Sequence, residues 1–414
     1  MDGETIVCVA TRAWNSLWRD SQQIMSRIAA RNRVLYFEPG RNPDRPLFSE
    51  LLRTWPNLFT IRSMEVRENL IVFESPTSLP LARKNLPRRL LQVTTPRIIA
   101  INEWILARHI SRVIGDLGVH APILWLYDPK HSRLAGKFGE KLVCYYNYDE
   151  YSQFDHNQRI RELVGQLDDG LARRADAVFT TSRGQWRRRR AFNAETHLIP
   201  NGVDFDLFHR ALDPGTPIAP DIARLPGPRI GFVGWLGYQI DAELLVGVAE
   251  AYPDCTLALV GPDCLPDDAR RRRLHELANV AFLGQKALET LPEYLKALDV
   301  ALIPYRIGGH TLTVYPLKLH EYLAAGRPIV ATALPELKPF SNVVRVAETP
   351  ADFIRQIRDA LGEHDSEAVA ARVAVARENT WDNRVAEIYR VLDGRLAAKK
   401  GGTNEQHLPC LDPL

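Results

Sequence analysis

The sequence predicts an α/β protein made of two Rossmann-like domains, each a doubly wound parallel sheet covered by helices on both faces. Short apolar runs alternate with amphipathic helical stretches along nearly the whole chain, and this alternation is typical of parallel sheets with helical crossovers. A Pro/Gly-rich linker at residues 213–228 interrupts the alternation once, after which it restarts. The length of 414 residues is sufficient for two such domains.

The first half carries strand patterns separated by helical ones. Strands rich in β-branched and aromatic residues are expected at residues 5–10, 33–39, 69–75, 121–129, 141–150, 175–182 and 197–204. Helices with apolar residues at helical spacing are expected at residues 21–31, 97–117 and 159–174. Residues 41–95 otherwise read as irregular because they are rich in proline.

The second half repeats the same rhythm. Strands are expected at residues 228–237, 255–262, 279–284, 299–305 and 328–332, and helices at residues 241–251, 289–298 and 316–325, with further helices to the end. Ligands of such sheets bind beyond the carboxyl ends of the strands, so a central cleft between the two domains is the expected site. The tail at residues 400–414 has the composition of a disordered segment.

Composition excludes several classes of protein. Apolar content of 45% and charged content of 25% are ordinary for a soluble globular protein, and a net charge of +3 does not indicate nucleic acid. The chain has no run of eighteen apolar residues and no basic N-terminal leader, so neither a transmembrane helix nor a signal peptide is expected. Its five cysteines lack Cys-x-x-Cys spacing, which indicates reduced packing residues rather than a disulfide framework or zinc site. We therefore expect a cytoplasmic protein.

One acid stands out in the second half. Glu321 follows Lys318 by three residues in an expected helix of otherwise apolar and small residues, preceded by a Gly/Thr-rich loop. The pair could be an ordinary surface ion pair, which contributes little. Alternatively, the loop and helix start could form an anion site, with Glu321 accepting hydrogen bonds from vicinal sugar hydroxyls. The spacing alone leaves both interpretations open.

Six fragments of the second half resemble one family when taken in order. These fragments are "IPNGVDFDLF", "RIGFVGWLG", "CTLALVGP", "NVAFLG", "LPEYLKALDVALIPY" and "PLKLHEYLAAGRPIVAT". They are similar to the C-terminal half of the GT-B retaining glycosyltransferases of family 4. The fragments "RVLYFEP", "LWLYDP" and "ADAVFTTS" resemble its envelope-polysaccharide branch, of the teichuronic-acid type. The resemblance covers roughly residues 1–395.

The resemblance implies a GT-B fold and a reaction. The N-terminal domain would span residues 1–203 and bind the acceptor, joined by a C-terminal helix at about 381–399, and residues 204–380 would bind the nucleotide sugar. The implied reaction is transfer of a sugar with retention from a UDP-, GDP- or dTDP-sugar to a glycan or lipid-linked acceptor, without a bound metal or other cofactor. A GT-B epimerase and a catalytically silent subunit that binds sugar nucleotides are the alternatives.

Site residues in the second half carry over by position. Glu321 matches the glutamate that binds the ribose hydroxyls, and Gly234 the glycine where the backbone approaches the ligand. The loop whose N–H groups meet the diphosphate matches Thr311, Leu312, Thr313 and Val314. Gly261 and Pro262 end the next strand, near the base.

The chain departs from the family at three positions. Thr313 stands where the family has a first glutamate, and Trp235 and Ile240 stand where it has an arginine and a lysine facing the diphosphate. Lys318 or Arg306 could replace the missing cations, and Lys318 is the better candidate because it shares the helix face of Glu321.

In the first half the family's strand-end histidine is replaced. The stretch "CYYNYDE" offers Asn147 or Asp149, and an aspartate there could orient an acceptor hydroxyl or stabilise positive charge at the anomeric carbon. The alternative is a helix cap. Asp128, at the end of "LWLYD", carries the same ambiguity, and Arg19 could either face a phosphate or begin a solvated helix.

Basic residues cluster in three places. Residues 75–102 contain no acid, and leucines are interleaved with five basic residues, namely Arg83, Lys84, Arg88, Arg89 and Arg97. This composition is typical of a segment that contacts an anionic membrane surface, although a solvated loop is the alternative. Residues 187–190 form a second run, and residues 270–273 read as a solvated helix face. Nucleic-acid binding is not expected, because no recognition module is present.

Overall fold

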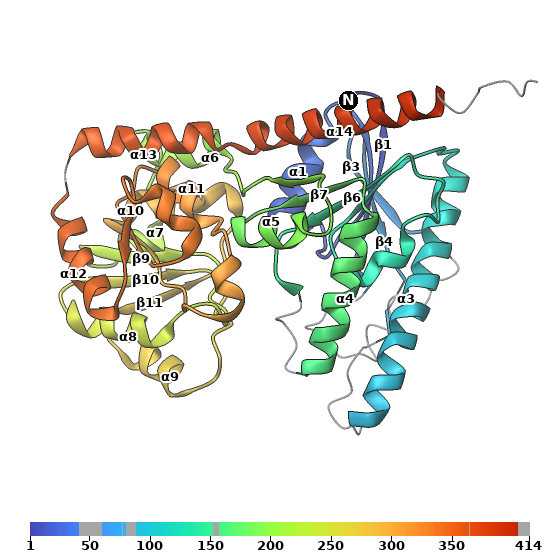
Figure 1. Cartoon of the computed structure of the whole chain (residues 1–414). Coiled ribbons are helices and arrows are strands. Elements are labelled where there is room, and N and C mark those ends of the chain that lie inside the picture. Colours follow the sequence, from blue (N-terminus) through green and yellow to red (C-terminus); the bar gives the residue numbers. More distant parts are fainter. Residues whose placement is uncertain (41–59, 77, 80–87, 152–156, 364, 405–414) are drawn as a thin grey trace, which may run out of the picture. The chain divides into compact units, whose positions relative to one another are not determined.

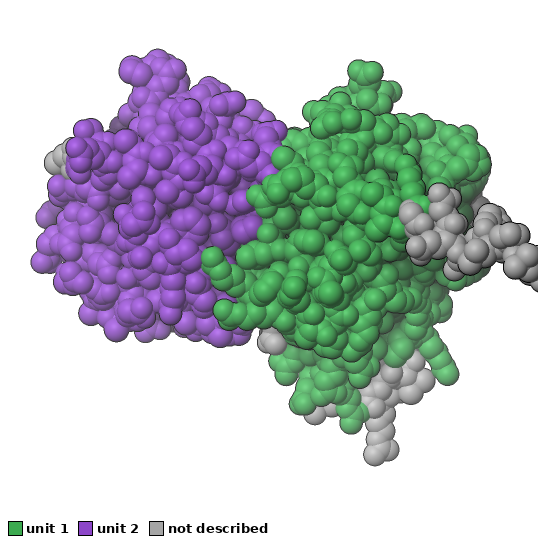
Figure 2. Space-filling model, turned by 45° about the horizontal axis from the view of Figure 1, so that its top comes forward, with its two compact units in different colours: residues 1–199, 385–414 green, residues 200–384 purple. Residues whose placement is uncertain are grey.

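The computed structural model describes residues 1–40, 60–76, 78–79, 88–151, 157–363 and 365–404. The chain forms two compact units, residues 1–199 with 385–414 (unit 1) and residues 200–384 (unit 2), coloured separately in Figure 2. The Pro/Gly-rich linker is not the boundary between them. Its Ala219 and Ile222 are buried in the core of unit 2.

Unit 1 contains an eight-stranded sheet in the order β3-β4-β2-β1-β5-β6-β7-β8. All neighbours are parallel except β3 and β4. Its strands are β1 (Thr5–Val9), β2 (Arg33–Glu38), β3 (Ser63–Arg67), β4 (Leu70–Glu74), β5 (Ile123–Leu126), β6 (Leu142–Asn147), β7 (Ala177–Thr180) and β8 (Thr196–Leu198). The edge strand β3 was not expected from the sequence. Its five residues are all exposed, and its apolar alternation is limited to Met64 and Val66.

The helices of unit 1 are α1 (Asp20–Ile28), α3 (Arg88–Asp116), the 3₁₀ helix η2 (Pro129–Leu134), α4 (Gln158–Arg174), α5 (Arg183–Arg190) and α14 (Trp381–Asn404). The helix α3 has 29 residues and extends past the end of the sheet (Figure 1). It begins nine residues before the start expected from the sequence at residue 97, and Pro96 lies inside the helix. The core of the unit is a cluster of aliphatic and aromatic residues from the strands, α3 and α4.

Unit 2 contains a six-stranded parallel sheet in the order β11-β10-β9-β12-β13-β14. Its strands are β9 (Arg229–Val233), β10 (Thr256–Val260), β11 (Val280–Gly284), β12 (Val300–Ile303), β13 (Ile329–Thr332) and β14 (Arg345–Ala347). Numbered within the unit, this order is 3-2-1-4-5-6, the usual order of dinucleotide-binding sheets. The strand order therefore reverses between β9 and β12, where such sheets bind their ligands.

Helices flank the unit 2 sheet (Figure 1). They are α6 (Phe205–His209), α7 (Pro220–Ala223), α8 (Ala242–Ala251), α9 (Ala269–Glu276), α10 (Leu291–Ala297), α11 (Lys318–Ala324), α12 (Pro350–Leu361) and α13 (Ser366–Glu378), with 3₁₀ helices η4 (Arg210–Leu212), η5 (Leu288–Thr290), η6 (Gly309–Thr313) and η7 (Pro335–Phe340). The four central strands, β10, β9, β12 and β13, are almost fully buried, as expected for a parallel sheet covered on both faces. The edge strands β11 and β14 are less buried.

The C-terminal helix α14 begins in unit 2 and continues into unit 1. Within unit 1, the Tyr389 hydroxyl receives a hydrogen bond from the Asn32 side chain at 3.1 Å, and Ile388 and Leu392 are fully buried. Arg395 and Lys399 pair with Glu195 and Asp176 at 3.1 and 2.8 Å. The predicted return of this helix to the first domain is confirmed by these contacts.

Candidate functional site

Two glycines end neighbouring strands at the switch point of unit 2. Gly234 follows β9, and a Cβ atom added there would lie 2.9 Å from Cε of Lys318 and 3.0 Å from Cζ of Phe232. Gly261 follows β10 with a φ of 141°, and its added Cβ would lie only 1.7 Å from the Gly234 carbonyl oxygen. Glycine is therefore required at Gly261 for backbone packing, and Gly234 leaves room for the Lys318 stem. The role expected for Gly234, close approach to a ligand, stays a prediction.

The helix α11 places Glu321 at this end of the sheet. Leu319 and Leu323 are fully buried, and the Tyr322 hydroxyl receives a hydrogen bond from the Val233 N–H at 2.8 Å. These contacts fix the helix against the last residue of β9. Glu321 is consequently held in place by its neighbours on the helix rather than by its own ion pair.

Glu321 and Lys318 form a half-buried ion pair. The Lys318 Nζ atom lies 2.6 Å from Glu321 Oε2, and the two side chains are only 17% and 13% exposed. Burial raises the pKa of Glu321, and the charge and hydrogen bond of Lys318 oppose that rise. The second oxygen, Oε1, has no hydrogen-bond partner among the described residues. The pair is thus neither a solvated surface pair nor fully satisfied, and Oε1 can accept a ligand's hydroxyl.

The Gly/Thr-rich loop before α11 is closed by its own hydrogen bonds. The buried Thr311 hydroxyl donates to the carbonyl oxygens of Arg306 at 2.5 Å and Gly308 at 2.8 Å. Thr311 and Val314 also donate their backbone N–H groups within the loop, at 3.3 and 3.2 Å. Binding a diphosphate through all four N–H groups of residues 311–314 would require these two bonds to break. That role stays a prediction, and the geometry favours the central part of the loop.

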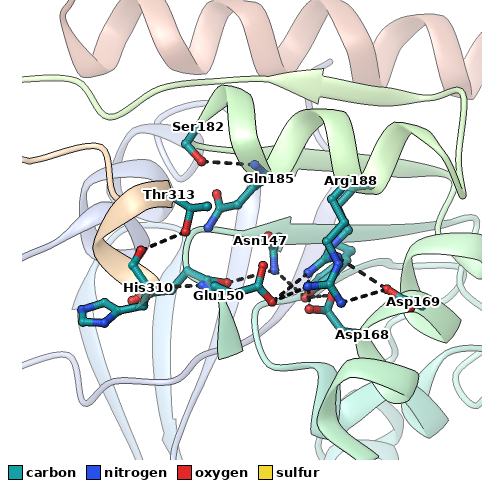
Figure 3. A network of polar contacts seen from close by, with 12 residues as sticks. Asn147, Glu150, Asp168, Asp169, Ser182, Gln185, Arg188, His310 and Thr313 are labelled. Carbon is teal, nitrogen blue, oxygen red and sulfur yellow. Dashed lines mark hydrogen bonds and ion pairs between the residues drawn. The ribbon is translucent and has the colours of Figure 1, made fainter. Parts of the chain in front are cut away.

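Two further residues of the loop have different surroundings. The Thr313 hydroxyl donates to the His310 carbonyl oxygen at 2.9 Å, a contact drawn in Figure 3, and Leu312 is 43% exposed. The Arg306 Nε atom donates to the Ile240 carbonyl at 3.1 Å, while its Nη2 atom is buried without a partner in the described chain. Arg306 thus keeps one unsatisfied cationic donor near β12, and both it and Lys318 remain candidates for the missing cations.

Trp235 and Ile240 occupy the two positions where the family has cations. The Trp235 ring meets the Tyr238 ring edge-on with centroids 5.4 Å apart, and Tyr238 lies 5.0 Å from the His310 ring. Ile240 is fully buried and pairs with Tyr305 in an isolated bridge. An apolar residue at Ile240 is therefore explained by packing, and the loop after β9 presents rings where charges were expected.

Unit 1 gathers charged side chains at the carboxyl ends of β1 and β6. Asp149 follows β6, and its Oδ1 atom accepts a hydrogen bond from the Glu150 N–H at 3.0 Å. Burial raises the pKa of Asp149 to about 7, against the opposing charges of Arg19 and Arg12. Asp20, at the start of α1, behaves alike, since burial raises its pKa to about 6 against the same two arginines. Asp149 is thus partly protonated near neutral pH, as a general acid or base requires.

Asn147 lies beneath this loop. Its side chain is fully buried and donates to the Tyr145 hydroxyl at 2.8 Å and to the Asp149 carbonyl oxygen at 3.2 Å. These two hydrogen bonds connect Asn147 to the loop that carries Asp149, and the Asn147 Oδ1 atom has no hydrogen-bond partner in the described part of the chain. The catalytic role expected for Asn147 stays a prediction.

A buried ion network extends from Asn147 (Figure 3). The Tyr145 hydroxyl donates to Asp168 Oδ1 at 2.7 Å, and the Asp168 carboxylate pairs with the fully buried Arg189. Arg188 binds Glu150 at 2.8 Å. Burial raises the pKa of Asp168 to about 6, and Arg189 opposes this. The network attaches α4 and α5 to the loop that carries Asp149.

This network includes two arginines of the basic run at residues 187–190. Two of its arginines pair with internal acids, and Arg190 lies over the Trp186 ring at 5.3 Å. The run is therefore largely structural. The sequence signal for Asp168 was present, because this acid shares the buried stripe of α4 with Ile160, Val164 and Leu171.

The remaining candidates of unit 1 have local roles. Asp128 is an N-cap, since its side chain accepts from the Lys130 N–H at 2.9 Å and pairs with Lys130 Nζ at 3.0 Å. Arg19 is the N-cap residue of α1. Arg83 and Lys84 lie outside the described residues. In unit 2, the run at residues 270–273 pairs with surrounding acids on an exposed face, as expected.

Two general findings bear on the site. No helix in the described part of the chain is long and apolar enough to cross a bilayer. Within the same residues, no group of three His, Cys, Asp or Glu side chains is arranged to hold a metal ion. Cys8, Cys144 and Cys255 are buried free thiols, and Cys264 is an exposed one.

Comparison with known proteins places these features in a family context. Residues 227–363 match the family model described as glycosyl transferases group 1. TuaH of Bacillus subtilis (strain 168), assigned as a teichuronic acid biosynthesis glycosyltransferase, is 29% identical over 242 residues, which are 56% of this chain and 60% of that protein. The match thus spans less than two thirds of the length of this relative.

Solved structures match nearly the whole chain. An α,α-trehalose-phosphate synthase (UDP-forming) from Burkholderia vietnamiensis is 13% identical with a TM-score of 0.70, covering 96% of this chain and 98% of that one. A sucrose-phosphate synthase from Thermosynechococcus elongatus is 18% identical with a TM-score of 0.67, covering 95% and 100%. At such identities the likeness establishes the fold.

Proposed function

Because the chain has the GT-B fold and its residues 227–363 form a group 1 glycosyltransferase domain, we propose that it transfers a sugar from a nucleotide donor during envelope-polysaccharide synthesis. The observation that carries this proposal is the half-buried Glu321, whose Oε1 atom is unpartnered among the described residues at the switch point of a dinucleotide-type sheet. The similarity to TuaH supports the envelope-glycan assignment. The acceptor is a glycan or a lipid-linked glycan.

We propose that unit 2 binds the donor through its nucleoside diphosphate. Glu321 Oε1 accepts the ribose hydroxyls, and Lys318 and Arg306 supply positive charge for the diphosphate. Because a synthase with the same fold is described as UDP-forming, UDP is the first nucleotide to test. Transfer proceeds with retention, Asp149 serves in unit 1 as the proton-exchanging carboxyl, and no metal is bound.

The test is calorimetric titration of UDP against 2′,3′-dideoxyuridine diphosphate. Two hydrogen bonds to a charged acceptor are each worth about 1.5–3 kcal/mol, so the wild type should prefer UDP strongly. Glu321→Ala should weaken UDP binding about ten- to a thousandfold and abolish this preference. Glu289→Ala, an exposed glutamate of the same unit, is the matched control. Full discrimination retained in Glu321→Ala would contradict the proposal, and GDP and dTDP complete the series.

A silent binding subunit remains the second candidate, because Trp235, Ile240 and Thr313 replace three charged residues of the family. The two functions differ in one measurement. A transferase releases UDP faster when an acceptor is added, whereas a silent subunit binds UDP without releasing it from a UDP-sugar. An epimerase would convert the donor with no acceptor present.

We also propose contact with an anionic membrane, through a face of α3. Arg97, Ile101, Trp104, Arg108 and Arg112 follow one another at spacings of three or four residues, which places them on one helix face. Trp104 is 60% exposed and Ile101 45%, and the Arg108 guanidinium lies 5.1 Å from the Trp104 ring centre. Exposed aromatic and cationic groups together are typical of a membrane-surface helix.

Vesicle sedimentation tests this contact. Binding to vesicles with phosphatidylglycerol should fall steeply with added salt, since exposed charges are screened, and Trp104→Ala should reduce it. Val66→Ala, which truncates an exposed residue of β3, is the control. Equal binding to neutral vesicles would contradict an electrostatic contribution.

A further inference from the structure

Unit 1 contains a cavity of about 460 Å³ that none of the residues predicted from sequence, apart from Asp128, helps to form. It lies at the carboxyl ends of four adjacent strands, β4, β2, β1 and β5. Ser75 follows β4, Pro39 follows β2, Ala10 follows β1, and Asp128 closes the series after β5. Its volume is within the range of small-molecule sites, about 300–1,000 Å³.

The wall of this cavity holds buried polar atoms without hydrogen-bond partners. They are the Ser75 Oγ, Glu103 Oε2 and His131 Nδ1 atoms, unpaired within the described residues. Ser75 and Glu103 are each only 3% exposed, and Glu103 Oε2 is 3.7 Å from the Arg133 Nε atom, too far for a hydrogen bond. Leaving a buried polar atom unpaired costs about 1–3 kcal/mol. Three such atoms around one cavity indicate a ligand that supplies their partners.

The cation of the wall already has an acidic partner, since Lys130 pairs with Asp128 at 3.0 Å. The wall also contains Glu38, whose Oε1 atom accepts a hydrogen bond from the Trp14 N–H at 2.5 Å. Burial lowers the pKa of His131, so its imidazole is neutral at pH 7. Burial also raises the pKa of Glu103 to about 7, so that this carboxyl both donates and accepts near neutral pH. An anionic ligand would therefore gain little, whereas hydroxyl groups match these neutral donors and acceptors.

The rest of the wall is apolar. Val9, Ala10, Pro76, Ile99 and Leu106 contribute aliphatic surface. A sugar ring combines hydroxyls at its edge with an apolar C–H face, and such a wall is complementary to both. The side chain of Asn102 exchanges two hydrogen bonds with the backbone of Leu79, at 2.7 and 2.9 Å, which fixes one rim of the cavity.

We propose that this cavity binds the acceptor, and that it selects an uncharged, polyhydroxylated sugar unit over a phosphorylated or carboxylated one. Ser75, Glu103 and His131 hydrogen-bond the hydroxyls, and the aliphatic wall packs against the ring. The term acceptor rests on the proposed transferase function, whereas binding of a neutral sugar does not.

Saturation-transfer NMR on the full chain tests the selectivity. The probes are methyl β-glucoside, methyl β-galactoside and N-acetylglucosamine, against glucose 6-phosphate and glucuronate, each up to about 50 mM because single sugars bind weakly. The neutral probes should show saturation transfer and the anionic ones should not. Equal signals from both groups, or none from the neutral probes, would overturn the proposal.

Two variants locate the binding. Ser75→Ala should weaken neutral-sugar binding about two- to tenfold without lowering the unfolding temperature, because the Oγ atom has no partner to lose. Ile99→Trp should fill the cavity and abolish binding. Ser26→Ala, a buried serine elsewhere in unit 1, is the matched control. Unchanged binding in both cavity variants would contradict the assignment.

Titration of the same variants with UDP separates this inference from the proposed function. UDP affinity should be unchanged in both variants, since the cavity belongs to unit 1. If the wild type binds UDP but no neutral sugar, only the cavity assignment fails. If it binds neutral sugars but no nucleoside diphosphate, the transferase proposal fails and the sugar site stands.

Discussion

Apart from the additional edge strands β3 and β8 of unit 1, the sheets of the two units share a strand order, but the units differ in how they place acids. In both sheets the strand order reverses at the first strand, between β1 and β5 and between β9 and β12. In unit 1, burial raises the pKa of four carboxyls to about 6 or 7, namely Asp20, Glu103, Asp149 and Asp168. Cationic partners lower the pKa of two others, Asp2 and Asp128. In unit 2, partners lower the pKa of most shifted acids of the described residues, namely Asp221, Asp263, Asp268 and Asp352, and Glu321 is an exception. The acids whose pKa is raised to about 6 or 7 thus all lie in unit 1, although the two sheets are similar in topology.

The difference in pKa shifts arises from whether an acid lies on the buried or the exposed face of its helix. Asp168 lies on the buried stripe of α4, and Asp20 begins α1 directly after the first strand. In unit 2, Asp268 caps the exposed helix α9, and Asp352 lies in the exposed first turn of α12. Unit 1 consequently stores buried charge next to its strand ends, and unit 2 keeps its strand ends for glycines and one ion pair.

The largest effect is expected from breaking the buried pair of unit 1. Arg189→Met leaves Asp168 buried without its cation, which should destabilise unit 1 by about 3–5 kcal/mol. Arg187→Met, in the same run but exposed, should change the unfolding free energy by less than about 0.5 kcal/mol. Denaturant unfolding monitored by hydrogen exchange in each unit measures both. Equal effects of the two variants would contradict the structural role of Arg189.

The pH dependence of the two units should differ in sign. A carboxyl whose pKa is raised by folding contributes stability below its unfolded pKa, and this is lost as pH rises through the folded pKa. Unit 1 should therefore lose stability between pH 4 and about 7, by on the order of 5 °C in unfolding temperature. The unit 2 acids whose pKa is lowered by folding stabilise the unit above about pH 4. Their contribution is lost only as the pH falls below that value. Calorimetry at pH 5 and 8 checks this, and parallel shifts of both units would refute it.

Substituting alanine for the two strand-end glycines of unit 2 should destabilise the protein to different extents. The loss should depend on which atoms the added Cβ would contact. Gly261→Ala drives a methyl group into the Gly234 backbone at positive φ and should cost about 2–4 kcal/mol. Gly234→Ala meets the end of a flexible lysine and a phenyl edge and should cost about 1–2 kcal/mol. Thermal unfolding of the two variants measures the order. A reversed order would mean that Lys318 cannot move aside.

The smallest effect is expected at the anchor of α11. Tyr322→Phe removes the acceptor of the Val233 N–H, which should destabilise unit 2 by about 1–2 kcal/mol. Because Glu321 is held through this helix, UDP affinity should fall less than tenfold. Calorimetry of the variant gives both values. A loss as large as that of Glu321→Ala would assign the tyrosine a direct role in binding.

Much of the fold could be predicted from the sequence. The spacing of apolar residues distinguishes buried strands from amphipathic helices, and glycine and proline residues mark where these elements end. The long apolar strands and the start of α11 follow directly from these patterns. The edge strand β3 could not be predicted, since exposed residues carry no burial pattern. Site prediction reached Glu321 and Lys318 as a pair, but not the burial that distinguishes them from a surface pair.

Long-range pairs limited the prediction of the remaining site. The partners Asp168 and Arg189 are 21 residues apart, and nothing local indicates that an arginine in a basic run points inward. The hydrogen bonds of Asn147 to Tyr145 and to the Asp149 backbone could not be read from its residue type either. The cavity of unit 1 could not be predicted, because its polar residues come from three separate parts of the chain. Ser75 follows β4, Glu103 lies in α3 and His131 lies in η2.

The course of α14 has a consequence for biosynthesis. Residues 200–384 form a continuous unit, whereas unit 1 needs residues 385–404 to cover Asn32 and Glu195. On a ribosome, unit 2 can fold while unit 1 still lacks its last helix. Residues 1–199, nearly half of the chain, therefore cannot complete unit 1 until residues 385–404 are translated. Premature termination near residue 384 would release a protein with a complete second unit and an unfinished first one.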